Sequence, residues 1–111
     1  MLRTYRVLVT GQFDQPASMV REQLLTEQPA HDVVASAFAP EGTFSYTQTL
    51  TRFTLRYLLS IDEGSAVEAD AMAELEGEVR AGDHLAARGV PFKALTVSAT
   101  CMQDIKVKPR R

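Results

Sequence analysis

The chain has 111 residues, of which 45% are apolar and 23% charged, a composition typical of one globular domain over residues 1–111. Its net charge of −2 lacks the basic excess that phosphate contacts require, which argues against a nucleic-acid partner. A single cysteine excludes an intramolecular disulfide, and no window resembles a secretory signal or a membrane helix. We therefore expect a complete cytoplasmic protein with no membrane contact.

The first third of the chain alternates between strand and helix patterns. Residues 4–14, TYRVLVTGQFD, alternate apolar and polar side chains and predict a strand. Residues 14–29 predict a short helix with Asp14 as its N-cap. A second strand is expected over residues 31–38, and Pro-Glu-Gly at 40–42 indicates a turn.

Three further segments have strand patterns. Residues 43–49 are rich in Thr, Ser and aromatic side chains and predict an extra strand, although the pattern leaves open whether it is a separate one. Residues 52–61 give the clearest strand, because every second side chain is apolar without interruption. Residues 92–107 alternate in the same way and predict the last strand.

A long helix is predicted over residues 62–89. It opens on a capping box, in which the Ser65 hydroxyl and the Glu68 carboxylate each satisfy a free backbone amide. Apolar and small residues then recur at intervals of three and four and predict the buried stripe, which is Met72, Leu75, Val79, Gly82 and Ala86. On this stripe, Gly82 is expected to let the helix lie close to a sheet.

The order of these segments predicts the fold class. Strand, helix, a meander of strands, helix and strand is the order of an α+β, ferredoxin-like split βαβ sandwich with a mainly antiparallel sheet. Each predicted helix has one apolar stripe, so we expect both helices on one face of the sheet. The opposite face then has no helix to cover it.

This uncovered sheet face is the candidate ligand site. Two mid-strand arginines, Arg6 and Arg56, could bind a carboxylate, phenolate or enolate oxygen, and packing or a salt bridge between subunits is the alternative. Val34 and Ser36 are expected to join the face. The candidate ligand-binding residues are Arg6, Leu8, Thr10, Phe38, Thr54, Arg56, Leu58, Thr96, Ser98 and Met102.

Other chemistry-bearing residues are too scattered to predict a metal site or a cofactor. His84 is expected to be a solvated helix residue, and His31 a loop residue with a weaker claim to acid–base chemistry. Cys101 lies in the apolar phase of its strand and is expected to be a small buried hydrophobe. Three further polar side chains could reach a ligand: Tyr46, Tyr57 and Asp104. The pattern leaves open which face of the sheet Tyr46 and Asp104 point to.

Three stretches, VTGQFD, FAPEGTFSYTQTLTRFT and SATCMQDIKV, resemble a family of small actinobacterial proteins known as a domain of unknown function. The resemblance covers most of the chain, and APEGTFSY and MQDIK are its most specific parts. It implies a free-standing cytoplasmic α+β protein and supplies no catalytic residues. A more distant similarity to dimeric α+β-barrel proteins implies aromatic or polyketide-like ligands.

Two functions follow from these expectations, and whether the protein is an enzyme stays open. In the first, two copies pair as a homodimer, and the uncovered face binds a small molecule, with cofactor-independent cyclase or monooxygenase activity as one outcome. In the second, the protein is a non-catalytic assembly protein, and the same face is its dimer interface.

Overall fold

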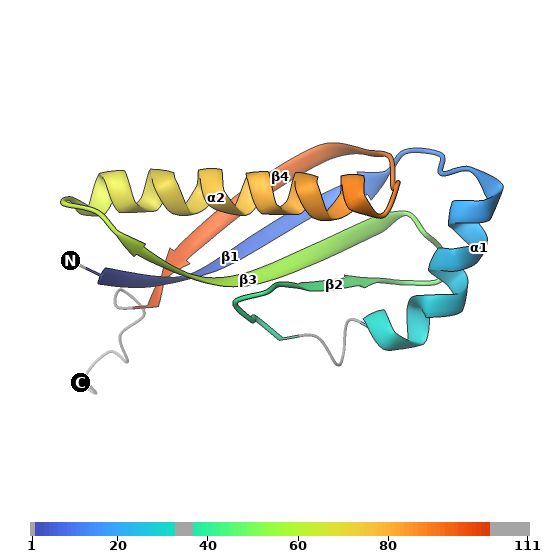
Figure 1. Ribbon diagram of the computed structural model, residues 1–111, viewed down its shortest axis with the longest axis horizontal. Coiled ribbons are helices and arrows are strands. Elements are labelled where there is room, and N and C mark those ends of the chain that lie inside the picture. The colour runs from blue at the N-terminus through green and yellow to red at the C-terminus, as the bar shows by residue number, and fades with distance from the viewer. Residues whose placement is uncertain (1, 33–36, 103–111) are drawn as a thin grey trace, which may run out of the picture.

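The structure is a computed structural model that describes residues 2–32 and 37–102 (Figure 1). Its elements follow the order strand, helix, strand, strand, helix, strand, with a short 3-10 helix after the first helix. They are β1 (Leu2–Phe13), α1 (Ser18–Glu27), η1 (Gln28–His31), β2 (Thr43–Tyr46), β3 (Arg52–Asp62), α2 (Ala66–Ala87) and β4 (Phe92–Cys101). No helix within the described ranges is long and apolar enough to cross a membrane.

The four strands form one antiparallel sheet in the order β2-β3-β1-β4, which confirms the α+β class. β1 and β3 pair along almost their whole length, from Leu2 opposite Asp62 to Gln12 opposite Arg52. Because side chains alternate along a strand, this register places every apolar side chain of one phase on the same face. That face forms the core, and the other face keeps the hydroxyls and arginines.

The extra strand predicted over residues 43–49 is β2, which is shorter than expected and forms the sheet edge beside β3. Half of the strand predicted over residues 31–38, residues 33–36, lies outside the described residues, and residues 37–38 are not in a strand. His31, at its predicted start, belongs to η1 instead, because Pro29 sits at the beginning of that 3-10 turn.

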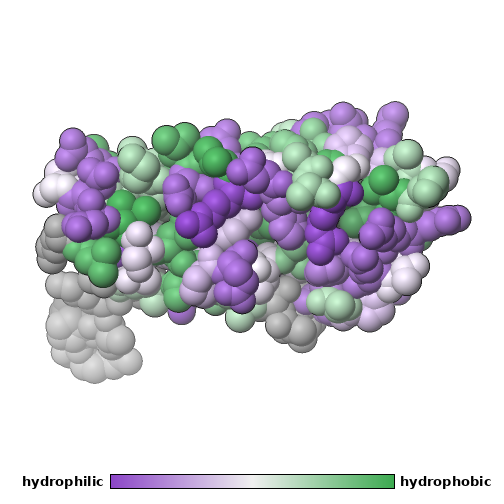
Figure 2. All heavy atoms as spheres, viewed as in Figure 1, coloured by the Kyte–Doolittle hydropathy of each residue, from purple (hydrophilic) through white to green (hydrophobic). Residues whose placement is uncertain are grey.

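Helix α2 covers the core face, but it turns a different stripe to the sheet from the one predicted. Its buried residues recur every four positions and are Ala69, Ala73, Gly77, Ala81 and Leu85. The predicted stripe faces outward: Met72 is 38% exposed, Leu75 54% and Val79 51%. Figure 2 shows hydrophobic atoms along the edge of the molecule where α2 lies. Small side chains pack inward because the helix lies close to β1.

The glycine that permits this close approach is Gly77, and the expectation for Gly82 was wrong. A Cβ at Gly77 would overlap Cγ1 of Val7, a fully buried residue of β1. A Cβ at Gly82 would have no neighbour within 4 Å. The Ser65 half of the predicted capping box is confirmed, since the Ser65 hydroxyl accepts a 3.1 Å hydrogen bond from the Glu68 amide, whereas the Glu68 carboxylate accepts from the Ser65 hydroxyl rather than from a backbone amide. It fixes the first turn of α2.

Helix α1 does not share the face with α2, so the prediction of two helices on one face is wrong. Figure 1 shows α1 at the end of the sheet, crossing the direction of the strands. Its buried Leu24 caps the core there, and the Leu24 carbonyl accepts a 2.6 Å hydrogen bond from the Tyr46 hydroxyl. Ala17 rather than Asp14 is the N-cap, because the Asp14 amide donates to Pro91 beside β4.

Candidate functional site

The sheet face opposite α2 carries a row of hydroxyl groups that crosses all four strands. Ser45 of β2 lies opposite Thr54 of β3, Thr54 opposite Thr10 of β1, and Thr10 opposite Thr96 of β4. The Thr10 and Thr96 hydroxyls are hydrogen-bonded at 2.6 Å. Because a hydroxyl can both donate and accept a hydrogen bond, this row can bind either a donor or an acceptor group of a ligand.

Next to the hydroxyl row, arginine and leucine alternate across β1 and β3. Arg6 lies opposite Leu58, and Arg56 lies opposite Leu8, so the two arginines are diagonal neighbours. Diagonal side chains on an antiparallel pair are roughly 7 Å apart at Cβ, which is within reach of one shared ligand. The guanidinium carbon of Arg6 also lies 5.5 Å from the ring centre of Phe38. We call the four strand residues Arg6, Leu8, Arg56 and Leu58 the arginine–leucine square.

The structure brings nearly all of the predicted site residues together. Eight of them share this face by strand register: Arg6, Leu8, Thr10, Thr54, Arg56, Leu58, Thr96 and Ser98. Phe38 joins through its contact with Arg6. Met102 is half-buried and follows β4, one residue beyond the last paired position. Val34, Ser36 and Asp104 lie outside the described residues.

Sequence reasoning missed three residues of this face: Thr43, Ser45 and Arg52. Thr43 lies opposite Arg56, and Ser45 is fully buried and accepts a 3.0 Å hydrogen bond from Nη1 of Arg56. Arg52 lines two hollows of about 230 and 320 Å³, the first shared with Thr10 and Thr96 and the second with Thr54 and the threonines between β2 and β3. The sequence could have identified Arg52, because it is two residues before Thr54 and therefore points to the same face of the strand.

The electrostatics of this face differ from those of the whole chain. The net charge of the chain is −2. Yet this face has three arginines and no carboxylate among the described strand residues between two cross-strand pairs, Gln12 with Arg52 and Arg6 with Leu58. Such a surface attracts anions, and Arg can hold a carboxylate through two parallel hydrogen bonds.

A second polar cluster lies on the helix side of the sheet, where α1, η1 and the end of α2 meet. Arg88 joins the two helices, because its Nη1 donates to Oε1 of Glu27 at 2.9 Å and its Nε donates to Nε2 of His84 at 3.1 Å. The hydrogen bond from Arg88, with a second one from Gln23, holds the pKa of the Glu27 carboxyl below its usual range. His31 is not a free loop residue either, since its Nδ1 lies 2.9 Å from the Phe44 carbonyl.

The expectation that His84 is solvated was wrong. Its ring is half-buried, with its centre 5.1 Å from that of Phe44, and its Nε2 accepts the Arg88 hydrogen bond. Burial, followed by the nearby Arg88 and His31, lowers the pKa of His84 below its ordinary value of 6.5. His84 is therefore a neutral imidazole at pH 7, and its ring proton is on Nδ1.

This environment predicts a loss of stability in mild acid. Below pH 6.5, His84 of the unfolded chain takes up a proton before His84 of the folded chain does, so folding becomes less favourable as the pH falls. His84→Gln keeps an acceptor for Arg88 but cannot be protonated. Urea unfolding at about pH 8 and about pH 5.5 should show a larger loss for the native protein than for the variant. Equal losses of stability in the native protein and the variant would contradict the lowered pKa of His84.

The comparisons with known proteins identify the family of the chain. It matches Family of unknown function (DUF6204) over residues 1–111 and belongs to that family, which confirms the resemblance to an uncharacterised domain. No curated protein and no solved structure matches the chain. Among the described residues, no group of three or more His, Cys, Asp or Glu could hold a metal ion.

Proposed function

We propose that the chain is a ferredoxin-like split βαβ domain whose uncovered sheet face binds a small apolar molecule carrying an anionic oxygen. The ferredoxin-like assignment is supported by the topology. The segment with α1 leads from β1 to β2 past β3, and α2 leads from β3 to β4 past β1. Two interleaved crossovers of this kind define a split βαβ sheet.

The arginine–leucine square is the observation that carries the binding proposal. Arg6 and Arg56 approach a ligand from diagonal corners, and Leu8 and Leu58 fill the other two corners. An aromatic or polyketide-like ring can lie on the leucines while its carboxylate, phenolate or enolate oxygen accepts from the guanidinium groups. The hydroxyl row next to the square supplies further donors and acceptors.

The same arrangement supports an enzymatic form of the proposal. Guanidinium groups that bind a developing enolate oxygen would stabilise that anion. A cofactor-independent cyclase or monooxygenase requires stabilisation of this kind. The alternative, a non-catalytic assembly protein with this face as its dimer interface, is less well supported. If two copies packed face to face, their arginines would come together and repel each other. The described strand residues between the Gln12–Arg52 and Arg6–Leu58 pairs offer no carboxylate to balance them. The homodimer and the cytoplasmic location stay predictions.

Replacing the two arginines tests the proposal. We expect Arg6→Met and Arg56→Met each to weaken binding of 2-naphthoate about tenfold or more, because a hydrogen bond to a charged group is lost. NMR titration measures this affinity, with uncharged 2-naphthamide as the comparison ligand. Arg21→Met, on the exposed surface of α1, is the matched control and should bind as the native protein does.

Native mass spectrometry of the same proteins separates the two functions. Ligand binding requires that the arginine variants keep their subunit number and lose affinity only. If naphthoate binding survives both substitutions, the arginine assignment is wrong. If the variants instead change subunit number, and the native protein binds neither ligand, the face is an assembly interface.

A further inference from the structure

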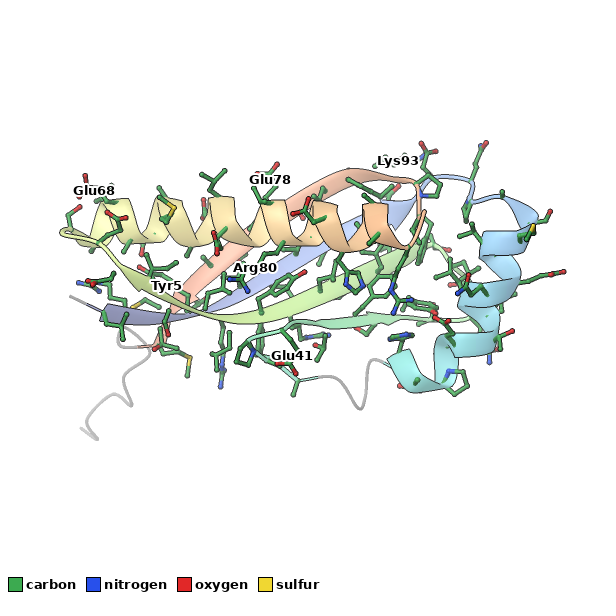
Figure 3. The ribbon with its side chains drawn as sticks, in the orientation of Figure 1. Tyr5, Glu41, Glu68, Glu78, Arg80 and Lys93 are labelled. Carbon is green, nitrogen blue, oxygen red and sulfur yellow. The ribbon has the colours of Figure 1, made fainter. Side chains whose placement is uncertain are left out.

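A groove of about 410 Å³ lies on the helix side of the molecule, between α2 and the turn at residues 40–42. Its lining comes from three separate parts of the chain and consists of Glu41, Tyr57, Arg80, Asp83 and His84. Figure 3 shows Arg80 extending from α2 towards the strands, with Glu41 on the turn below it. The groove does not share a residue with the arginine–leucine square on the opposite face.

Tyr57 gives this groove a polar group that no described residue satisfies. The residue is only 2% exposed, yet its hydroxyl forms no hydrogen bond with any described residue. Among the described residues, every fully buried polar side-chain atom has a partner, so the small exposed part of Tyr57 includes its hydroxyl, which opens into the groove. Burial raises the pKa of Tyr57 and outweighs the opposing effect of Arg80, so the hydroxyl stays neutral. A ligand that accepts or donates there completes a hydrogen bond that little water can supply.

The charges that remain free in the groove are negative. The carboxylates of Glu41 and Asp83 form no ion pair with any described residue. Arg80 is already occupied: its Nη2 lies 3.0 Å from Oε2 of Glu76, and its Nη1 donates to the Pro40 carbonyl at 3.2 Å. Its charge is thus balanced by Glu76, which leaves the two other carboxylates without a counterion among the described residues.

His84 adds no positive charge to the groove. Its Nε2 accepts a hydrogen bond from Arg88, so that nitrogen carries no proton. The imidazole is neutral at pH 7 because burial and two neighbouring basic groups disfavour its protonated form. A ligand in the groove therefore meets two carboxylates, a hydroxyl, a neutral ring and the guanidinium group of Arg80, which is already paired with Glu76.

From this arrangement we propose that the groove binds a small protonated amine. An ammonium group has three N–H donors and no acceptor, which suits two carboxylates and the oxygen of the Tyr57 hydroxyl. The volume of about 410 Å³ is within the range of small-molecule sites. This site is independent of the proposed anion site, because it lies on the other face and binds the opposite charge.

NMR titration with 1-butylamine and 1,4-diaminobutane tests this site, with 1-butanol as the uncharged analogue. We expect both amines, but not the alcohol, to shift the backbone amide signals of residues 41–42 and 83–84. Asp83→Asn and Tyr57→Phe should each weaken amine binding about threefold to tenfold, because each removes one partner of the ammonium group. Neither variant loses a hydrogen bond or ion pair within the described protein, so both are expected to fold.

Glu78→Gln is the matched control. Glu78 is an exposed carboxylate of α2 that points away from the sheet in Figure 3, so its removal should change amine affinity less than twofold by long-range electrostatics alone. Equal binding of butanol and butylamine would overturn the charge assignment. An absence of shifts at about 50 mM amine, or affinity unchanged in both groove variants, would overturn the site.

Discussion

Gly77→Ala is expected to lower the free energy of unfolding by about 1–2 kcal/mol, although alanine is the better helix former. The added Cβ would overlap Cγ1 of Val7, whose β-branched side chain is fully buried in the central strand β1. Overpacking of this kind costs about 1–3 kcal/mol, which exceeds the gain of up to about 1 kcal/mol in helix propensity. The helix must therefore shift away from the sheet.

Gly82→Ala is the matched control on the same helix. Its Cβ would have no neighbour within 4 Å, so only the propensity term remains, and the variant should be more stable by about 0.5–1 kcal/mol. Urea unfolding of the two variants and the native protein measures both effects. If Gly77→Ala is as stable as Gly82→Ala, the backbone of α2 is not in close contact with β1.

The strands could be predicted from the sequence because one physical rule governs them. A period of two separates the two faces, so Leu55 and Tyr57 are buried while Arg56 and Leu58 line the open face, as expected. The helix was harder, because hydrophobicity alone identifies the largest apolar side chains. In α2 the decisive quantity was the space beneath the helix, which only small residues such as Ala73 could fit.

The candidate anion site could be predicted in composition but not in geometry. Strand phase places Arg6 and Arg56 on one face, whereas their diagonal arrangement depends on the register of β1 against β3. Register is a long-range property that a single sequence does not show. The groove of the proposed amine site was missed for the same reason, since Glu41, Tyr57 and Asp83 come from a turn, a strand and a helix.

Gly42→Ala is expected to lower the free energy of unfolding by about 3 kcal/mol, more than either glycine substitution in α2. The residue has a φ of +89°, and a Cβ there would overlap the ring of Tyr57. A left-handed conformation costs a non-glycine residue about 1–2 kcal/mol, and the overlap with a buried ring adds a similar amount. The turn must move, the ring must move, or both.

Gly89→Ala separates these two costs. Gly89 follows α2 with a φ of +68°, but a Cβ there has no neighbour within 4 Å. This variant should lose only about 1 kcal/mol, from backbone conformation alone. Urea unfolding and 1-butylamine titration of both variants then test the turn and the groove together.

Because Gly42 holds the Tyr57 ring in place, Gly42→Ala should weaken amine binding as well as stability, whereas Gly89→Ala should leave the affinity unchanged. Whether the ring or the turn moves, the Tyr57 hydroxyl and Glu41 cannot both keep their positions in the groove. Equal losses of stability in the two variants would show that the Tyr57 ring does not pack on the turn, and the position of its hydroxyl in the groove would then be wrong.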